Sequence, residues 1–274
     1  MKKKQYYDTK KNWFLYIGGA ITLFMVVLIV LGYVWTPYEP SAMDVACMNQ
    51  APSLAHIMGT DNFGRDIFSR VLEGAGTTFF VALCVVLIGV VAGTLIGALT
   101  GYFGGWGDEV LMRICDSITA FPSILLALVA IAVLGPGTAN VIWVLGILFI
   151  PSFARIVRGE YAKCKNLNYV KSARLMGAGP VRIMVRHILP NTFPVLLPAI
   201  SIGFNNAVLA EASMSFLGVG VSPTAASLGR MLSDGQTYLL RGAPWYALCV
   251  GTTIVLLILG FSMLGEGLQQ RRRR

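Results

Sequence analysis

The side chains that most often carry chemistry in proteins are few in this chain and widely separated. The 274 residues include two histidines, His56 and His187, and five cysteines with no C-x-x-C pair. The spacing therefore indicates neither a zinc site nor a redox motif. The topology described below places the two histidines on opposite sides of a membrane, so they cannot bind one metal ion together. A hydrolase or a metalloenzyme is disfavoured, and no catalytic residue, metal ligand or cofactor is predicted.

The sequence also has no nucleotide-binding loop. The pattern G-x4-G-K-[ST], in which backbone amides and a lysine hold the phosphates of ATP, occurs nowhere in the chain. We therefore expect a non-catalytic protein. Any energy from ATP must reach it through a partner.

Three polar residues stand within an apolar stretch, namely Asn205, Asn206 and Glu211. An ionised glutamate at the middle of a bilayer costs about 3 kcal/mol, so such a residue needs a partner or an aqueous cavity. Two interpretations stay open. Either the three side chains line a transport path or its outer gate, or they bond to neighbouring helices or to a partner subunit.

The composition indicates which elements must position these side chains. Apolar residues make up 55% of the chain and charged residues 13%, and the mean hydropathy is +0.68. A soluble domain of this size needs a more charged surface. The apolar residues occur in blocks of about 20, the length that crosses about 30 Å of hydrocarbon. The sequence thus predicts an integral membrane protein of the all-α class.

We expect one transmembrane domain, at residues 13–268, with six membrane-spanning helices. The first has a basic segment before it, as a signal peptide does, but it is too long and no cleavage site follows. It is therefore expected to stay in place as an anchor. The six helices are predicted at residues 13–35, 77–102, 113–134, 138–156, 191–213 and 244–264.

The net charge of +9 is distributed as the positive-inside rule requires. Of the 22 lysines and arginines, 18 lie in the N-terminal residues 1–12, at Arg113, within 155–186 or in the tail 269–274. Six spans with both termini in the cytoplasm place all 18 on the cytoplasmic side. The chain is therefore expected to be a multi-pass protein surrounded by membrane lipid, and binding to nucleic acid is disfavoured.

Two segments, 36–76 and 214–243, are expected on the outer side. The first ends in apolar residues at helical spacing, which indicate a short amphipathic helix at the membrane surface. Before and within this helix lie the charged residues Asp61, Arg65, Asp66 and Arg70. Either they dock an external partner or they lock the surface helix to the next span. We favour the lock.

The second predicted span carries glycines at strict four-residue spacing. Residues three or four apart lie on one helix face, and glycine there lets another helix come close to the backbone. We expect this stripe to serve tight packing within the bundle. Its members are Gly89, Gly93, Gly97 and Gly101.

The predicted cytoplasmic loop at 157–190 is too long and too patterned for a passive connection. Tyr169, Ala173 and Met176 belong to the apolar side of a short helix that ends at the glycines around Gly177. A second amphipathic turn leads back to the membrane at Leu189-Pro190. Two short helices against the cytoplasmic face predict a docking knob for a soluble partner.

This loop resembles the cytoplasmic signature of the permease subunits of binding-protein-dependent ABC importers, E-A-A-x3-G-x9-I-x-L-P. Lys171-Ser172-Ala173, Gly177 and Leu189-Pro190 fall on its spacing. Lys171 stands in place of the glutamate, Ser172 in place of the first alanine, and His187 in place of the isoleucine.

Further motifs are similar to the dipeptide, oligopeptide and nickel branch of that family, and the resemblance spans residues 13–268. One is the stretch G-T-D-x-x-G-R-D-x-x-S-R, which begins at Gly59. The others are Gly101–Gly105, Ser215–Gly220 and Gly265–Leu268.

The resemblance implies the type I importer fold in a bacterial plasma (inner) membrane. It also implies a second, homologous permease that usually differs from the first, two ATP-binding subunits and an extracytoplasmic substrate-binding protein. The ATPases would dock on the loop, and the binding protein would face residues 61–70. The residues expected at the ATPase contact are Tyr169, Lys171, Ser172, Ala173, Arg174, Met176, Gly177, Leu189 and Pro190.

The leading functional hypothesis is the permease subunit of an importer for di- or oligopeptides. A nickel or metal-chelate importer is the alternative within the family. From a different class, a self-sufficient channel or ion-coupled carrier predicts buried charges in several helices or an inverted repeat. Only Glu211 is a clear buried charge, and no repeat is evident.

Overall fold

The computed structural model describes residues 2–222, 225–239 and 242–272. Arg241, Arg273 and Arg274, which belong to the predicted charge pattern, lie outside the described residues. The described chain is helical, and its only strand-like pairing is one isolated bridge between Thr60 and Asp66. The predicted all-α class is thereby confirmed.

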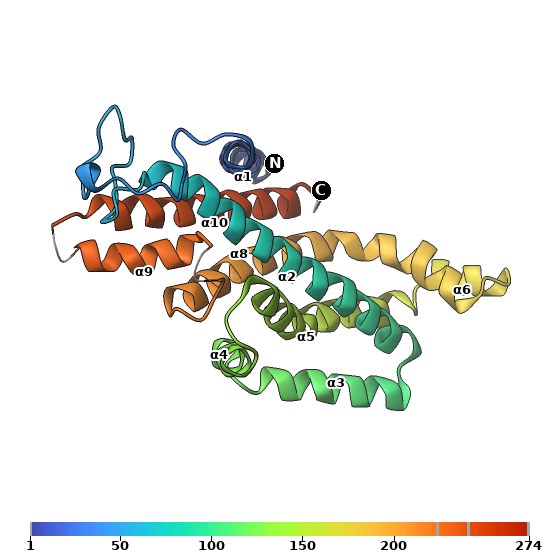
Figure 1. Ribbon diagram of the computed structural model, residues 1–274. Coiled ribbons are helices and arrows are strands. Elements are labelled where there is room, and N and C mark those ends of the chain that lie inside the picture. Colours follow the sequence, from blue (N-terminus) through green and yellow to red (C-terminus); the bar gives the residue numbers. More distant parts are fainter. Residues whose placement is uncertain (1, 223–224, 240–241, 273–274) are drawn as a thin grey trace.

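Figure 1 shows a bundle of long helices with a loop region at one end and α6 at the other. The α-helices are α1 (Lys2–Val34), α2 (Ile67–Phe103), α3 (Gly105–Thr119), α4 (Ser123–Leu134), α5 (Thr138–Cys164), α6 (Asn168–Leu175), α7 (Pro180–Arg182), α8 (Leu189–Phe216), α9 (Leu228–Leu239) and α10 (Trp245–Arg272). A 3-10 turn covers Val45–Cys47, and a π-helix covers Ile183–Ile188.

Within the described residues, five helical stretches are long and apolar enough to cross a membrane. They are Trp13–Val34, Ile67–Phe103, Thr138–Cys164, Pro180–Phe216 and Trp245–Gln270. A sixth crossing exists if α3 and α4, which meet at an angle of 85°, count as one span. This agrees with the six predicted spans in number but not in the shape of the third.

The prediction of one straight helix at 113–134 is wrong. Helix α3 begins earlier, at Gly105, and ends at Thr119, and α4 begins at Ser123 after a sharp bend. Pro122 causes the break, because it has no N–H for the helical ladder and disfavours helix at Phe121 before it. The bend leaves α4, at 12 residues, too short to cross the bilayer alone.

The predicted surface helix is not a separate element. Residues 67–76 form the first turns of α2, which continues for 37 residues to Phe103. Asp66 caps this helix, since its Oδ2 accepts hydrogen bonds from Ser69 N at 2.8 Å and Ser69 Oγ at 2.7 Å. The non-helical part of the predicted outer segment 36–76 therefore ends at Asp66.

The predicted loop 157–190 is also shorter than expected. Helix α5 continues to Cys164, and from Pro180 onward the chain is helical without interruption through α7, the π-helix and α8. The predicted second amphipathic turn is thus the end of a long helix, and α6 alone remains as a short helix. In the predicted loop 214–243, residues 228–239 form α9.

Helices α2 and α5 lie in close contact along the glycine stripe. An ideal Cβ at Gly93 would lie 2.6 Å from Phe153 Cβ, and one at Gly97 would lie 2.4 Å from Ala154 O. At Gly101 the corresponding distance to Arg158 O is 2.6 Å. Because backbone atoms cannot move aside, side chains at these positions would separate the two helices.

Helix α1 packs antiparallel to α10, also through glycine. A Cβ at Gly18 would lie 2.4 Å from Leu264 N, and one at Gly267 would lie 2.7 Å from Leu15 Cα. Gly265 in turn faces Ser201 of α8, with 2.4 Å from its ideal Cβ to Ser201 Cβ. These contacts direct the start of α1 and the end of α10 toward the end of the bundle that carries α6.

The packing role of the glycine stripe predicts that alanine has opposite effects on stability at a glycine of the stripe and at a glycine outside it. We expect Gly97→Ala to lower the stability of the purified chain by about 1–3 kcal/mol, because the new methyl group overpacks the α2–α5 contact. Gly251→Ala in α10, where a Cβ would have no neighbour within 4 Å, is expected to stabilise by about 0.5–1 kcal/mol through helix propensity. Thermal unfolding in detergent measures both. Equal effects at the two sites would contradict the packing role of the stripe.

Candidate functional site

The first candidate site is the α6 knob, which we define as residues 165–182. Helix α6 ends in a Schellman motif: Ala178 N donates to Ala173 O and Gly177 N donates to Arg174 O, both at 3.0 Å. Gly177 has φ +82°, the left-handed conformation that glycine adopts without strain. The glycine predicted to end the helix therefore fixes where the chain turns.

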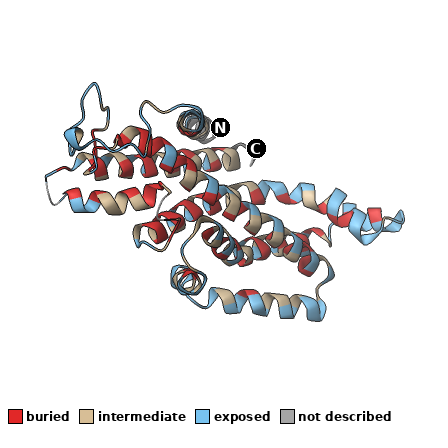
Figure 2. Ribbon diagram, viewed as in Figure 1, coloured by how far each residue is buried: buried red, intermediate tan, exposed pale blue. Residues whose placement is uncertain are grey.

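The α6 knob buries one side and exposes an apolar tip. Val170 and Ala173 are 0% and 3% exposed, whereas Leu175 and Met176 are 90% and 81% exposed. Figure 2 shows α6 as a mostly exposed element that projects from the bundle. An apolar pair left uncovered on a projecting helix indicates a contact with another molecule.

Hydrogen bonds fasten the α6 knob to the long helices. Asn191 Nδ2 donates to Tyr169 Oη at 3.1 Å, and Arg174 Nη2 donates to Tyr102 Oη at 3.4 Å. Beneath the knob, the buried Tyr161 hydroxyl donates to Met184 O at 3.1 Å. The knob is therefore held on both the α2 and the α8 sides.

The π-helix lies where the knob joins α8. Leu189 N donates to Met184 O, five residues earlier, and Pro190 follows without an N–H of its own. π-Helical turns inside α-helices are rare and occur often at functional sites. The Leu189-Pro190 pair of the sequence signature thus marks the change from π to α geometry.

Residues of the predicted ATPase contact fall into two groups. Ala173 is buried and Leu189 is partly buried, so both support the knob from within. The remaining members lie on its accessible surface: Tyr169, Lys171, Ser172, Arg174, Met176, Gly177 and Pro190.

Sequence reasoning missed the ion pairs that join α3 to α5 near this end. Arg158 of α5 binds the Asp108 carboxylate through two nitrogens, with 2.7 Å between Nη2 and Oδ2. Arg155 Nη2 lies 3.3 Å from Asp116 Oδ1 and also donates a hydrogen bond to Thr119 Oγ1. The pattern gave no signal for the Arg158–Asp108 pair, because the third span was expected to begin only at residue 113, after Asp108.

A second candidate site is a groove between α4, α5 and α8. Its volume is about 570 Å³, within the range of ligand pockets. Ser123, Ser152 and Asn206 supply polar groups from the three helices, and Phe149 and Phe153 are among the apolar lining. No charged residue, histidine or cysteine lines this groove.

The three polar residues of α8 predicted to act together, Asn205, Asn206 and Glu211, lie in different environments. Asn206 is exposed and lines the groove, whereas Asn205 has a buried Oδ1 without a hydrogen-bond partner. Glu211 is 0% exposed and lies away from the groove. Only Asn206 is therefore positioned to meet a molecule in the groove.

Glu211 lies where α8, α2 and the start of α9 meet. Its Oε1 accepts a hydrogen bond from Ser215 Oγ at 2.7 Å. The hydroxyl groups of Thr78 and Ser227 lie beside the same carboxyl group. Thr78 in turn accepts from Leu228 N at 3.2 Å. Oε2 has no partner within hydrogen-bond geometry. The geometry fits the interpretation in which Glu211 fastens helices together.

At the opposite end from α6, the predicted charged residues form a buried network. Asp61 is 1% exposed and accepts the N–H groups of Phe63 and Arg65 at 2.8 and 2.9 Å. Its other oxygen accepts Arg65 Nε at 2.7 Å and lies 3.9 Å from Arg70 Nε. A buried carboxylate with this many donors fits a structural lock of the outer segment on α2.

The network extends to His56 and to α9. Asp66 Oδ1 lies 2.9 Å from His56 Nδ1, and the His56 ring stacks on Tyr38 with 4.7 Å between centroids. Burial raises the pKa of Asp234 in α9, while the charges of Arg230 and Arg70 act in the opposite direction. The charges of the outer segment and of α2 thus reach Asp234 in α9.

The comparisons with known proteins bear on all of these features. A family model described as the binding-protein-dependent transport system inner membrane component matches residues 93–274. The chain belongs to this family. It is therefore a permease subunit of a bacterial ABC importer of the inner membrane, and the alternative of a self-sufficient carrier has no support.

Curated relatives place it in the peptide and nickel branch. The chain is 39% identical over 259 residues to a glutathione transport system permease protein, GsiD, of Pectobacterium atrosepticum. It is 42% identical over 258 residues to GsiD of Escherichia coli. Each comparison covers 93% of this chain and 85% of the relative.

Solved structures agree on the fold. An inward-facing structure of the MetNI methionine ABC transporter has a TM-score of 0.60 at 22% identity, and the match covers 75% of this chain and 97% of that one. A crystal structure of an amino acid ABC transporter with histidines has a TM-score of 0.57 at 22% identity, with 74% and 94% covered. The predicted type I importer fold is confirmed.

Glu211 gives the second prediction. We expect Glu211→Gln to keep the stability and the transport of the wild type, because the amide can both accept from Ser215 and donate to a hydroxyl. Glu211→Leu is expected to lose about 1–3 kcal/mol, because it leaves buried hydroxyl groups unpaired. Thermal unfolding and substrate uptake measure the two effects. A Gln variant that folds normally but transports poorly would assign Glu211 to the path instead.

Proposed function

We propose that this chain forms one half of the translocation path of an ATP-driven importer for small peptides, with glutathione among the candidates. The observation that carries the energy-coupling part of the proposal is the apolar tip of the α6 knob. The names of the curated relatives support the substrate class. Specific binding of the substrate is left to an extracytoplasmic binding protein.

The α6 knob is proposed to dock one of two ATP-binding subunits in the cytoplasm. Leu175 and Met176 would enter a hollow of the partner, while Lys171, Ser172 and Arg174 around them stay at the polar rim. The lysines and arginines near the knob support this orientation, because cytoplasmic loops carry the excess of positive charge. The start of α1 and the end of α10 are directed to the same side of the bundle as the α6 knob.

Movement of the docked knob would reach the path through α8. The chain is helical from Pro180 to Phe216, so the last residues of the knob and Asn206 belong to one continuous helical stretch. Tyr161 and the Arg158–Asp108 pair hold α5 and α3 at the same end. A rigid-body shift of the ATPases would therefore move α8 and α5, which form two walls of the groove.

The groove between α4, α5 and α8 is proposed as this chain's share of the path, completed by a homologous second permease. Its hydroxyl and amide groups suit the neutral backbone of a peptide. A bare nickel ion prefers imidazole, thiolate or carboxylate ligands, and the groove lining has none. A chelated metal remains the alternative substrate.

Docking is tested by Met176→Asp. A charge in a desolvated interface position costs about 2 kcal/mol or more, so we expect at least a tenfold loss of ATPase binding and of uptake. The control is Leu54→Asp, at an apolar residue that is also highly exposed but lies at the other end of the molecule. Co-purification of the ATPase and substrate uptake are measured at equal amounts of membrane-inserted protein. Unchanged ATPase binding in Met176→Asp would reject the assignment.

The substrate class is tested by uptake in cells that express the complete importer. We expect labelled glutathione or a labelled dipeptide to enter in an ATP-dependent way, and unlabelled di- and tripeptides to compete. Nickel chloride at the same concentration is expected not to compete. Nickel uptake that peptides do not inhibit would favour the metal importer and leave the docking of the ATPase untouched.

A further inference from the structure

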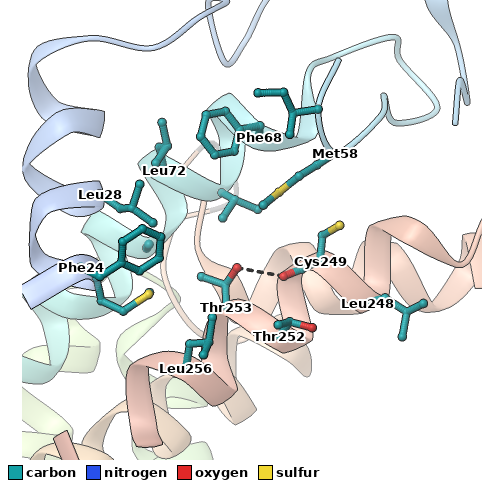
Figure 3. Close-up of a pocket in the computed structure, with 14 residues that line it drawn as sticks. Phe24, Leu28, Met58, Phe68, Leu72, Leu248, Cys249, Thr252, Thr253 and Leu256 are labelled. Atoms are coloured by element: carbon teal, nitrogen blue, oxygen red, sulfur yellow. Dashed lines mark hydrogen bonds between the residues drawn. The ribbon is translucent and has the colours of Figure 1, made fainter. Parts of the chain in front are cut away.

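A second groove, unrelated to the proposed path, lies between α1, α2 and α10. Its volume is about 540 Å³. Figure 3 shows Phe24 and Leu28 of α1, Leu72 of α2 and Leu256 of α10 around it, with Met58 of the outer segment above. The groove lies where α2 and α10 begin, so it belongs to the membrane half farther from the α6 knob.

Glycine lets α1 approach the backbone of its neighbours only above and below the groove. Toward the α6 end, Gly18 and Gly267 bring α1 and α10 into backbone contact, and Gly260 would place a Cβ 3.0 Å from Thr22 Oγ1. Toward the other end, a Cβ at Gly32 would lie 2.9 Å from Leu72 Cβ. Between Thr22 and Gly32 no glycine brings α1 against backbone. Met25 and Ile29, at 1% and 3% exposed, pack inward as side chains, and the space lies beside Phe24 and Leu28.

The lining of this groove is almost entirely hydrocarbon. The Thr253 hydroxyl is already used, since it donates to Cys249 O at 2.8 Å. No charged residue lines the groove. Phe24 and Leu248 are 56% and 63% exposed at its mouth, which opens toward the surface of three membrane-spanning helices. Its surroundings in the membrane are therefore acyl chains rather than water.

We propose that this groove binds one acyl chain of a phospholipid from the membrane half opposite the α6 knob. An extended peptide segment does not suit it, because its backbone N–H and C=O groups would find no partners among these side chains. Water is equally disfavoured by an apolar lining of this size. A bound acyl chain covers the part of α1 that its neighbours leave open, at Phe24 and Leu28, and so adds contacts between α1, α2 and α10.

The proposal is tested by counting retained lipid. The full chain is purified from bacterial membranes, washed in detergent until loosely bound lipid is removed, and measured by native mass spectrometry. We expect Thr252→Trp, which fills the groove, to retain one phospholipid fewer per copy of this chain than the wild type. Cys249→Phe, at a second lining position, is expected to give the same loss. Leu87→Trp, at an exposed position of α2 far from the groove, is expected to retain the wild-type number.

A photoreactive residue at position 252 in intact cells identifies what occupies the groove. We expect adducts with the mass of a phospholipid. Adducts with a polypeptide would overturn the proposal in favour of a subunit interface. An equal number of retained lipids in the wild type, Thr252→Trp and Cys249→Phe would overturn it in favour of an unoccupied groove.

Discussion

The close approach of α2 and α5 is the contact on which the rest of this structure depends. In a bilayer, apolar side chains gain little by leaving lipid for protein, so helices associate through van der Waals packing at small residues. The four glycines of α2 let α5 pack closely against the α2 backbone from Phe149 to Tyr161. This contact fixes the position of α2 relative to α5. Helix α5 forms one wall of the groove between α4, α5 and α8, and both helices support the α6 knob.

The same physics explains how α1 joins the bundle. Gly18, Gly260 and Gly267 seat one part of α1 on α10, and Gly32 seats another part on α2. Between these contacts α1 packs through larger side chains, since Met25 and Ile29 are buried, while Phe24 stays exposed beside a groove. Glycine contacts, buried side chains and a groove thus follow one another along one helix.

Polar groups are used at the ends of the bundle, and their burial decides their roles. Asp61, Asp66 and Glu211 are almost inaccessible. Asp61 and Asp66 accept several hydrogen bonds each, and Glu211 accepts one from Ser215, which suits groups that fasten segments together. Asn206 has no such set of partners and faces a groove. At the α6 end, charges hold α3 against α5 while apolar residues are left at the tip. The polar network therefore supports a contact surface that is itself apolar.

The sequence alone determined the membrane class, five of the six spans, the family and the turn at Gly177. These follow from properties local to the chain: apolar length, glycine spacing and the absence of a Cβ where φ is positive. The sequence also contains Pro122, which breaks the third span, but the prediction of that span did not take this proline into account. The tertiary structure decided the rest. It separated Asn206 from Glu211, merged residues 67–76 with α2, paired Asp108 with Arg158 across 50 positions, and left a groove beside α1. Each of these depends on which helix faces meet, and no periodicity within one segment contains that information.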